Sequence, residues 1–277
     1  METPAKDALA SETSPPLVIR TVQAGVAQLT LNRPDKRNAL NGPMMQALAS
    51  GLDAVRDDPE VRVVVLCGAG PAFSSGIDHT LLLEVFQKSQ QVPFRHVHHD
   101  LQDVFHRIER MEKPVIAVLH RACAGMALEL ALACDFRIAL ADCVMGLPEV
   151  AFGIIPDVGG TTRLVRTVGV PRAKELILTG KFLTAETAGR WGLVHEVATD
   201  AADLEARVTR LCARLAGFSP ITVGMGKSLI QQSADASASS SFQLEGVVQQ
   251  ALIAQPDLMS RFSLAVQFIR EQMANPE

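Results

Sequence analysis

Between residues 61 and 140 the sequence repeats one unit, in which an apolar strand-like segment is followed by a glycine-containing loop and a helical segment. Strands are predicted at 17–20, 26–31, 61–67, 115–119 and 136–140. Consecutive parallel strands need a long crossover connection, and helices usually provide it. The alternation therefore favours an α/β architecture with mainly parallel pairing.

The chain outside this region differs at its two ends. A helix is predicted to start near Pro43, with Asn41 as a possible cap. Beyond about Pro171 we expect no further strands. Helical patterns follow at 172–178, 185–190, 204–215, 221–232, 242–254 and 258–273, with a polar linker at 233–241. Apolar stripes on such a tail must be buried, and we expect another subunit to cover them.

Composition narrows the possible functions. The chain has 277 residues, 48% of them hydrophobic, and a net charge of −4 from mixed acids and bases. This balance argues against a nucleic-acid or anionic-membrane surface, and the apolar runs are too short or interrupted to span a bilayer. Residues 1–16 have no apolar signal core and are interpreted as a disordered leader. Five cysteines without a CxxC pair indicate reduced thiols in a cytoplasmic protein.

One carboxylate interrupts an apolar run, ACAGMALELALAC at 122–134. If the run is a helix with Gly125 near its start, the neighbours of Glu129 three and four positions away are all non-polar. An ionised carboxylate in such surroundings needs a partner from elsewhere or serves chemistry. Two interpretations stay open from this stretch alone: a structural acid that reaches solvent or caps a neighbouring element, and a catalytic acid.

Three glycine-containing loops are candidate ligand contacts. The first, GAGPAFSSG at 68–76, lacks the glycine spacing of a dinucleotide fingerprint and the G-x-S-x-G of a serine nucleophile elbow. It leaves a Gly-Ile-Asp turn whose backbone amides could face a ligand. The second opens the Glu129 helix, where the free N–H of Met126 suits an oxyanion.

The third loop, LPEVAFGIIPDVGGTTRL at 147–164, carries Glu149 and Asp157 before a Gly159-Gly160 pair that opens a helix. From this segment alone, Glu149 could equally be an ordinary loop acid and Asp157 a helix or turn cap.

Taken together, these segments carry a family resemblance. PAFSSGIDH, the acid-containing helix, LPEVAFGIIPDVGGTTRL, AKELILTGKFLTAETAGRWGLVHEV and RPDKRNAL follow in order through residues 17–232. The sequence resembles the crotonase, or enoyl-CoA hydratase/isomerase, superfamily. The resemblance implies a crotonase-like spiral of ββα turns over 17–200 that holds an acyl-CoA site. It also implies a helical C-terminal trimerisation region at 201–277, with homotrimers or homohexamers, an acyl-CoA thioester substrate and no separate cofactor.

The resemblance also assigns roles to residues. The backbone N–H groups of Ile77 and Met126 match an oxyanion hole, and Glu129 and Glu149 match the two glutamates of the hydratases. Asp157 matches an acid that the dienoyl-CoA isomerases use with the acid at the Glu149 position. Hydration of a 2-enoyl-CoA is the favoured reaction, and isomerisation is the alternative, because one scaffold hosts several chemistries. A non-catalytic CoA- or RNA-binding scaffold is a third possibility, which both retained glutamates count against.

Contacts to CoA are implied in three places. The first is the RPDKRNAL segment, with Lys36, Arg37 and Ala39. The second is the neighbouring loop, with Ser75, Gly76 and Asp78. The third is Lys227, which matches a position whose basic side chain often reaches CoA.

A histidine-rich segment lies outside these motifs. RHVHHD at 95–100 has two histidines, His96 and His99, at a spacing that could bind a metal. We favour instead a helix that lies at the surface or covers the acyl pocket, and we expect no metal.

Overall fold

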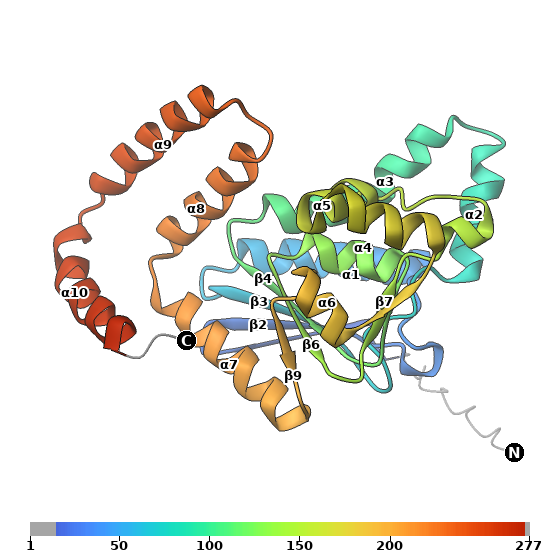
Figure 1. The fold of residues 1–277 in the computed structure, drawn as a ribbon, viewed down its shortest axis with the longest axis horizontal. Coiled ribbons are helices and arrows are strands. Elements are labelled where there is room, and N and C mark those ends of the chain that lie inside the picture. The colour runs from blue at the N-terminus through green and yellow to red at the C-terminus, as the bar shows by residue number, and fades with distance from the viewer. Residues whose placement is uncertain (1–14, 275–277) are drawn as a thin grey trace, which may run out of the picture.

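The computed structural model describes residues 15–274 (Figure 1), so the predicted leader at 1–16 lies almost wholly outside the described residues. The main sheet is six-stranded, in the order β1-β2-β3-β4-β6-β9. Its strands are β1 (Val18–Gln23), β2 (Val26–Leu31), β3 (Val63–Gly68), β4 (Val115–Leu119), β6 (Phe136–Leu140) and β9 (Glu196–Ala198). β1 pairs antiparallel with β2 and every other pair is parallel, which confirms the predicted α/β class.

A second, smaller sheet has the order β5-β7-β8, with β5 (Ala122–Ala124), β7 (Val144–Gly146) and β8 (Phe182–Thr184). The helices are α1 (Gly42–Asp57), α2 (His79–Ser89), α3 (Phe94–Arg110), α4 (Met126–Ala133), α5 (Gly160–Thr179), α6 (Ala185–Trp191), α7 (Ala201–Gly217), α8 (Pro220–Ser233), α9 (Ala238–Ile253) and α10 (Leu258–Ala274). Two 3₁₀ turns, η1 (Pro34–Lys36) and η2 (Glu149–Phe152), border the site described below.

Alternating side chains of β3 show how the sheet is covered. Val64 and Leu66 face the large core, whereas Val63 and Val65 face a second cluster that α7 closes through residues such as Cys212. In Figure 1, α1, α4 and α5 lie on one side of the main sheet and α7 lies on the other. The sheet is therefore buried on both faces, as expected for parallel strands.

Local chemistry explains the starts of two helices. The Asn41 side chain accepts a 2.9 Å hydrogen bond from the N–H of Met44 and caps α1, as predicted. α4 is buried along its whole length, in agreement with its apolar sequence. It begins after Gly125, whose φ of 54° falls in the left-handed region that favours glycine.

The structure corrects several sequence predictions. Residues 122–124 form β5 rather than the start of the helix, and β8 and β9 follow Pro171, where no strand was expected. These strands have three residues each, too few for a period-2 pattern to appear. Part of the predicted linker is helical, because α9 begins at Ala238. Within residues 15–274, no helix combines the length and apolar composition that a membrane span requires.

Candidate active site

Three strand ends meet at one point of the fold. β5 and β7 are parallel neighbours, and an isolated parallel bridge joins Ser74 to Cys123 of β5. The N–H of Gly125 donates to the carbonyl of Gly146 at 2.8 Å. Because the carboxyl ends of parallel strands lie at the same edge, the loops at 74–78, 125–126 and 147–149 emerge side by side. The topology thus brings together segments that are far apart in sequence.

These loops and the helices α2 and α3 enclose a cavity of about 500 Å³. Most of its wall is apolar, and all three predicted acids, Glu129, Glu149 and Asp157, lie in that wall. The other lining residues are Ile77, Leu82, Val85, Phe86, Ser89, Phe94, Leu101, Met126, Ile154, Ile155 and Val158. Its volume falls in the range of small-molecule binding pockets, and the acids are the titratable groups of an otherwise largely apolar wall.

Glu129 is 2% exposed and lies in the centre of α4. Its Oε2 accepts a 2.7 Å hydrogen bond from the N–H of Gly160, the first residue of α5. Burial raises the pKa of Glu129 to about 8; the charge of Glu149 adds to this, and the Gly160 hydrogen bond opposes it. The hydrogen-bond partner that Glu129 finds outside its own helix is therefore a backbone amide. Because its pKa is about 8, the carboxyl retains a proton near neutral pH.

Glu149 opens η2 and faces the same cavity. Its Oε2 is buried without a hydrogen-bond partner among the described residues, and burial raises its pKa to about 7. A Cβ added to Gly125 would lie 2.9 Å from Glu149 Oε1 and would push this carboxyl away from its position. An unpaired buried carboxyl next to an open cavity is typical of a group that binds substrate or water.

Asp157 lies in the loop between η2 and α5, and its side chain is half-buried. Burial raises its pKa, while the nearby His98 has the opposite effect. His98 belongs to the RHVHHD segment, which forms the start of α3 as the predicted cover of the cavity.

Two cavity-lining residues, Ile77 and Met126, have backbone amides available to a ligand. Ile77 forms an isolated parallel bridge with Leu40. In this bridge the N–H and the carbonyl of Leu40 bond to Gly76 and Asp78, so the N–H of Ile77 points away from Leu40. Met126 is the first residue of α4, where backbone N–H groups have no helical partner. A Cβ on Gly76 would lie 3.7 Å from the Met126 nitrogen and 2.4 Å from the Ala124 carbonyl oxygen. The close approach of the two segments therefore depends on glycine.

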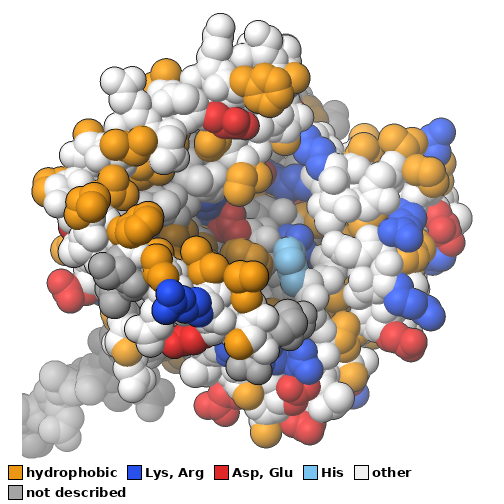
Figure 2. Space-filling view, turned by 60° about the vertical axis from the view of Figure 1, so that its left-hand side comes forward, with side chains coloured by type: hydrophobic (Ala, Val, Ile, Leu, Met, Phe, Trp, Pro, Cys, Tyr) orange, Lys and Arg blue, Asp and Glu red, His pale blue; other side chains and the backbone are white. Residues whose placement is uncertain are grey.

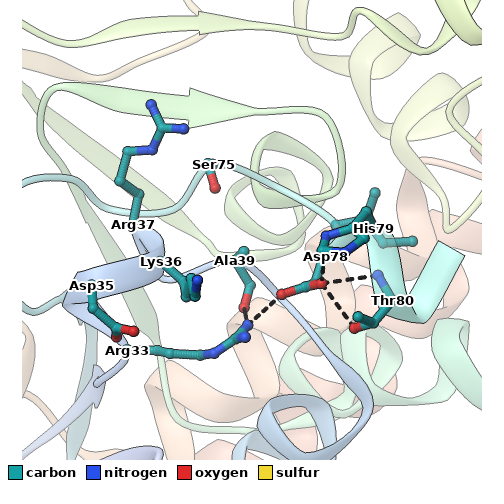
Figure 3. Close-up of a pocket in the computed structure, with 10 residues that line it drawn as sticks. Arg33, Asp35, Lys36, Arg37, Ala39, Ser75, Asp78, His79 and Thr80 are labelled. Atoms are coloured by element: carbon teal, nitrogen blue, oxygen red, sulfur yellow. Dashed lines mark hydrogen bonds and ion pairs between the residues drawn. The ribbon is translucent and has the colours of Figure 1, made fainter.

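A second cavity, of about 570 Å³, shares Ile77 with the first. It is lined by Arg33, Asp35, Lys36, Arg37, Ala39, Ser75, Ile77, Asp78, His79 and Thr80. Figure 3 shows Arg33 reaching the Asp78 carboxylate, with an N–O distance of 2.5 Å, and the Ala39 carbonyl. Arg33 is thereby neutralised, while Lys36 and Arg37 remain exposed cations at the cavity.

The structure distinguishes among the residues predicted to contact CoA. Lys36, Arg37, Ala39, Ser75 and Asp78 line the second cavity, although hydrogen bonds from Thr80 and Arg33 hold the Asp78 carboxylate and lower its pKa. Gly76 is not in the lining, and its carbonyl accepts from the N–H of Leu40.

Lys227 requires a correction, because the structure does not bring it to either cavity. Its buried ammonium donates to Asp135 Oδ2 at 2.7 Å and to the carbonyls of Ile108 and Lys113 at 2.9 and 3.2 Å. All three ammonium hydrogens are thus used inside the protein.

Sequence reasoning missed some side-chain contacts that shape the site. Asn38 is fully buried, and its side chain bonds to Ala69, Ala72 and Arg33, which fixes the loop beside the second cavity. Its φ of 53° lies in the left-handed region, which asparagine adopts more readily than most residues. The residue type was therefore the one sequence signal for this loop conformation. The amide of Gly160 and the side chain of His98 act across long sequence distances that no local pattern marks.

Comparison with known proteins agrees with this geometry. A family profile described as enoyl-CoA hydratase/isomerase matches residues 21–264. The chain belongs to the enoyl-CoA hydratase/isomerase family. A relative named crotonyl-CoA hydratase, from Syntrophomonas wolfei, is 36% identical over 212 residues, covering 76% of this chain and 80% of that protein.

Solved structures of the family confirm the fold. An enoyl-CoA hydratase from Bacillus anthracis superposes with a TM-score of 0.83 at 31% identity, covering 92% of this chain and 96% of that one. A Thermobifida fusca protein of the enoyl-CoA hydratase type, in complex with acetoacetyl-CoA, gives a TM-score of 0.78 at 32% identity. It covers 86% of this chain and 95% of its own. The family resemblance in the sequence is therefore confirmed.

Proposed function

We propose that this enzyme hydrates the 2,3 double bond of a 2-enoyl-CoA. The observation that carries the proposal is the pair Glu129 and Glu149, two buried carboxyls with raised pKa values on one apolar cavity. With values of about 8 and 7, a protonated and an ionised carboxyl can coexist near neutral pH, as acid–base catalysis requires. The chemistry uses only side chains, backbone amides and water.

Two amides would hold the thioester carbonyl, namely the N–H groups of Ile77 and Met126. Negative charge grows on this oxygen when a nucleophile adds at the β-carbon, so the donors bind the enolate more tightly than the substrate. In other enzymes one such donor lowers the activation barrier by about 3 kcal/mol. The N-terminus of α4 adds its partial positive charge at the same point.

The proton steps balance between the two glutamates. The ionised carboxyl takes a proton from water while the water oxygen bonds to the β-carbon and the π electrons move to the thioester oxygen. The protonated carboxyl then gives its proton to the α-carbon as the enolate collapses. One water is added, and the pair again holds one proton.

CoA would occupy the second cavity, because Ile77 links that cavity to the acyl site. Exposed Lys36 and Arg37 would attract its phosphates, and the backbone near Ala39 and Ser75 would border the adenine. The complex of the Thermobifida fusca relative with acetoacetyl-CoA supports an acyl-CoA ligand.

A second reaction is favoured by one observation: Asp157 lies on the same cavity as Glu149, and its charge helps to raise the pKa of Glu149. Two acids that face one conjugated chain could move a proton along it. Isomerisation of a 3,5-dienoyl-CoA to the 2,4-dienoyl form is therefore the alternative.

A spectroscopic assay of purified protein separates the two reactions. With crotonyl-CoA, we expect loss of the conjugated enoyl-thioester absorbance and formation of 3-hydroxyacyl-CoA. With a 3,5-dienoyl-CoA assayed in parallel, a new 2,4-dienoyl chromophore and silence on crotonyl-CoA would instead assign the isomerase. Turnover on neither substrate class would contradict both.

We also infer a homotrimer or homohexamer that assembles through α8, α9 and α10. These helices form an arm beside the body in Figure 1, and Figure 2 shows hydrophobic side chains gathered around a hollow on this side. Large apolar side chains are exposed along it, including Phe242, Val247, Met259, Phe262 and Met273. A monomer rarely leaves so much apolar surface in water. Light scattering on the purified protein should give the mass of three or six chains, and a monomer would contradict the inference.

A cytoplasmic location is part of the same proposal. All five cysteines are free thiols, and four of them are buried. Burial raises the pKa of Cys134 and Cys143 to about 12, which keeps these thiols protonated and unreactive. Fractionation of cells that contain the full-length protein tests this location, by showing which fraction holds the protein.

A further inference from the structure

The main-chain carbonyl of Asp157 is held by two side chains of one helix. His98 Nε2 lies 2.5 Å from this oxygen, and Gln102 Nε2 donates to it at 3.1 Å. The two side chains are one turn apart on α3 and therefore share a face. Because a carbonyl oxygen only accepts, His98 Nε2 carries the proton in this contact. Both lone pairs of the carbonyl are thus occupied by α3.

The same helix also lines the acyl cavity and is linked, through Arg163, to the residue after Asp157. Phe94 and Leu101 of α3 lie in the cavity wall. Near the other end of α3, Glu109 forms a bidentate ion pair with Arg163 at 2.7 and 2.6 Å, and Arg163 donates to the carbonyl of Val158 at 2.8 Å. α3 therefore fastens the loop before α5 directly at residue 157 and, through Arg163, at residue 158.

We propose that His98 and Gln102 are positioning residues, which hold Asp157 by its carbonyl so that its carboxyl stays at the cavity wall with Glu129 and Glu149. The proposal rests on the proposed function for the reaction it serves. The contacts of His98 and Gln102 with the Asp157 carbonyl do not depend on the reaction, so their effect on the pKa of Glu149 can be measured without turnover. The proposal also gives His98 of the histidine-rich segment a role beyond covering the cavity.

The consequence is electrostatic. Charged groups from several elements influence the pKa values of the three acids. Glu129 responds to Glu149, Asp157 and Arg163, and Glu149 responds to Asp157. Asp157 responds to His98, whose Nε2 lies 3.9 Å from Asp157 Oδ2. An ionised Asp157 disfavours ionisation of both glutamates, because like charges repel. If Asp157 turns to solvent, the pKa values of Glu149 and Glu129 fall.

Three variants test this hold. His98→Leu removes the donor, His98→Gln restores an N–H at a similar reach, and His96→Leu changes an exposed histidine on the same helix. The pKa of Glu149 is followed by NMR of protein labelled with ¹³C in the glutamate carboxyls, and a Glu149→Gln sample identifies the signal. We expect a fall of roughly one unit in His98→Leu. The value should return in His98→Gln and stay unchanged in His96→Leu.

An unchanged Glu149 titration in folded His98→Leu protein would overturn the proposal. If that variant does not fold, Gln102→Leu replaces it, with a smaller downward shift expected and no shift contradicting the proposal. Kinetics give a second readout: on a 2-enoyl-CoA, both limbs of the kcat pH profile should move to lower pH with KM unchanged. If wild-type protein hydrates no enoyl-CoA, the proposed function fails, and the NMR titration still decides the positioning role.

Discussion

The N–H of Gly160 donates a 2.7 Å hydrogen bond to Glu129 Oε2 and thereby joins the first turn of α5 to the buried acid of α4. This bond leaves Oε1 of Glu129 for the cavity. The same bond explains why residue 160 is glycine, because a Cβ there would lie 2.4 Å from Glu129 Oε2. The position of the acid is therefore set by a bond from the α5 backbone to the Glu129 side chain rather than by another charge.

Replacing Gly160 should thus damage catalysis more than folding. In Gly160→Ala the new methyl group displaces the Glu129 carboxyl, and a misplacement of about 1 Å lowers rates by about 10²-fold. Steady-state kinetics on a 2-enoyl-CoA would show this as a loss of kcat. Gly217→Ala at the end of α7 is the matched control, since nothing lies within 4 Å of its added Cβ. Equal kcat values for the two variants would contradict the role of the Gly160 contact.

Much of this arrangement could be predicted from sequence, and the reason differs by residue. The burial of Glu129 followed from its apolar neighbours at helical spacing, and the turn at Gly125 followed from a glycine at the start of that helix. Glu149 and Asp157 were candidates because they precede a Gly-Gly helix start. Their meeting in one cavity is confirmed, but it was implied only by family resemblance, since their side chains come from separate loops.

Other features depend on contacts that local patterns do not record. The contact of His98 with Asp157 spans 59 residues, and the bond of Gly160 to Glu129 spans 31. The three-residue strands depend on neighbours that are distant in sequence. β9 pairs with the longer β6, whereas β5, β7 and β8 pair with one another. Lys227 was expected near CoA because its type and position fit, but the Asp135 carboxylate lies within reach of its ammonium and binds it instead.

The raised pKa of Glu129 predicts a stability that depends on pH. Its folded value of about 8 exceeds the ordinary 4.5, so the folded state binds more protons than the unfolded state between these values. Stability from this group is complete below about pH 4.5 and is lost as pH rises through 8. Glu129→Gln, which cannot ionise, should therefore melt above wild type at pH 9, by about 4 °C or more, and near it at pH 5.

Differential scanning calorimetry of both proteins at the two pH values measures this difference. Glu205→Gln, at an exposed position on α7, should melt like wild type at pH 9 and at pH 5. A Glu129→Gln advantage that is equal at both pH values would mean that ionisation of this carboxyl is not responsible.

The exposed cations of the second cavity should affect binding rather than chemistry. The double variant Lys36→Ala, Arg37→Ala should raise KM for the CoA thioester about 3- to 10-fold and leave kcat unchanged. The difference should shrink at high salt because exposed charges are screened. Lys174→Ala, at an exposed position on α5, is the control and should change neither constant. A KM that does not change in the double variant would place the CoA phosphates elsewhere.

The central claim is that Glu129 and Glu149 together hydrate an enoyl thioester, and Glu149→Gln tests it most directly. The amide keeps the shape of the side chain but can neither accept the proton of water nor donate one to the α-carbon. We predict a folded protein with the circular dichroism of the wild type, and because the pKa of Glu149 is also raised, it should melt no lower than the wild type. Its kcat on crotonyl-CoA should be at least about 10³-fold lower, with KM little changed. Full activity of this folded variant would contradict the account.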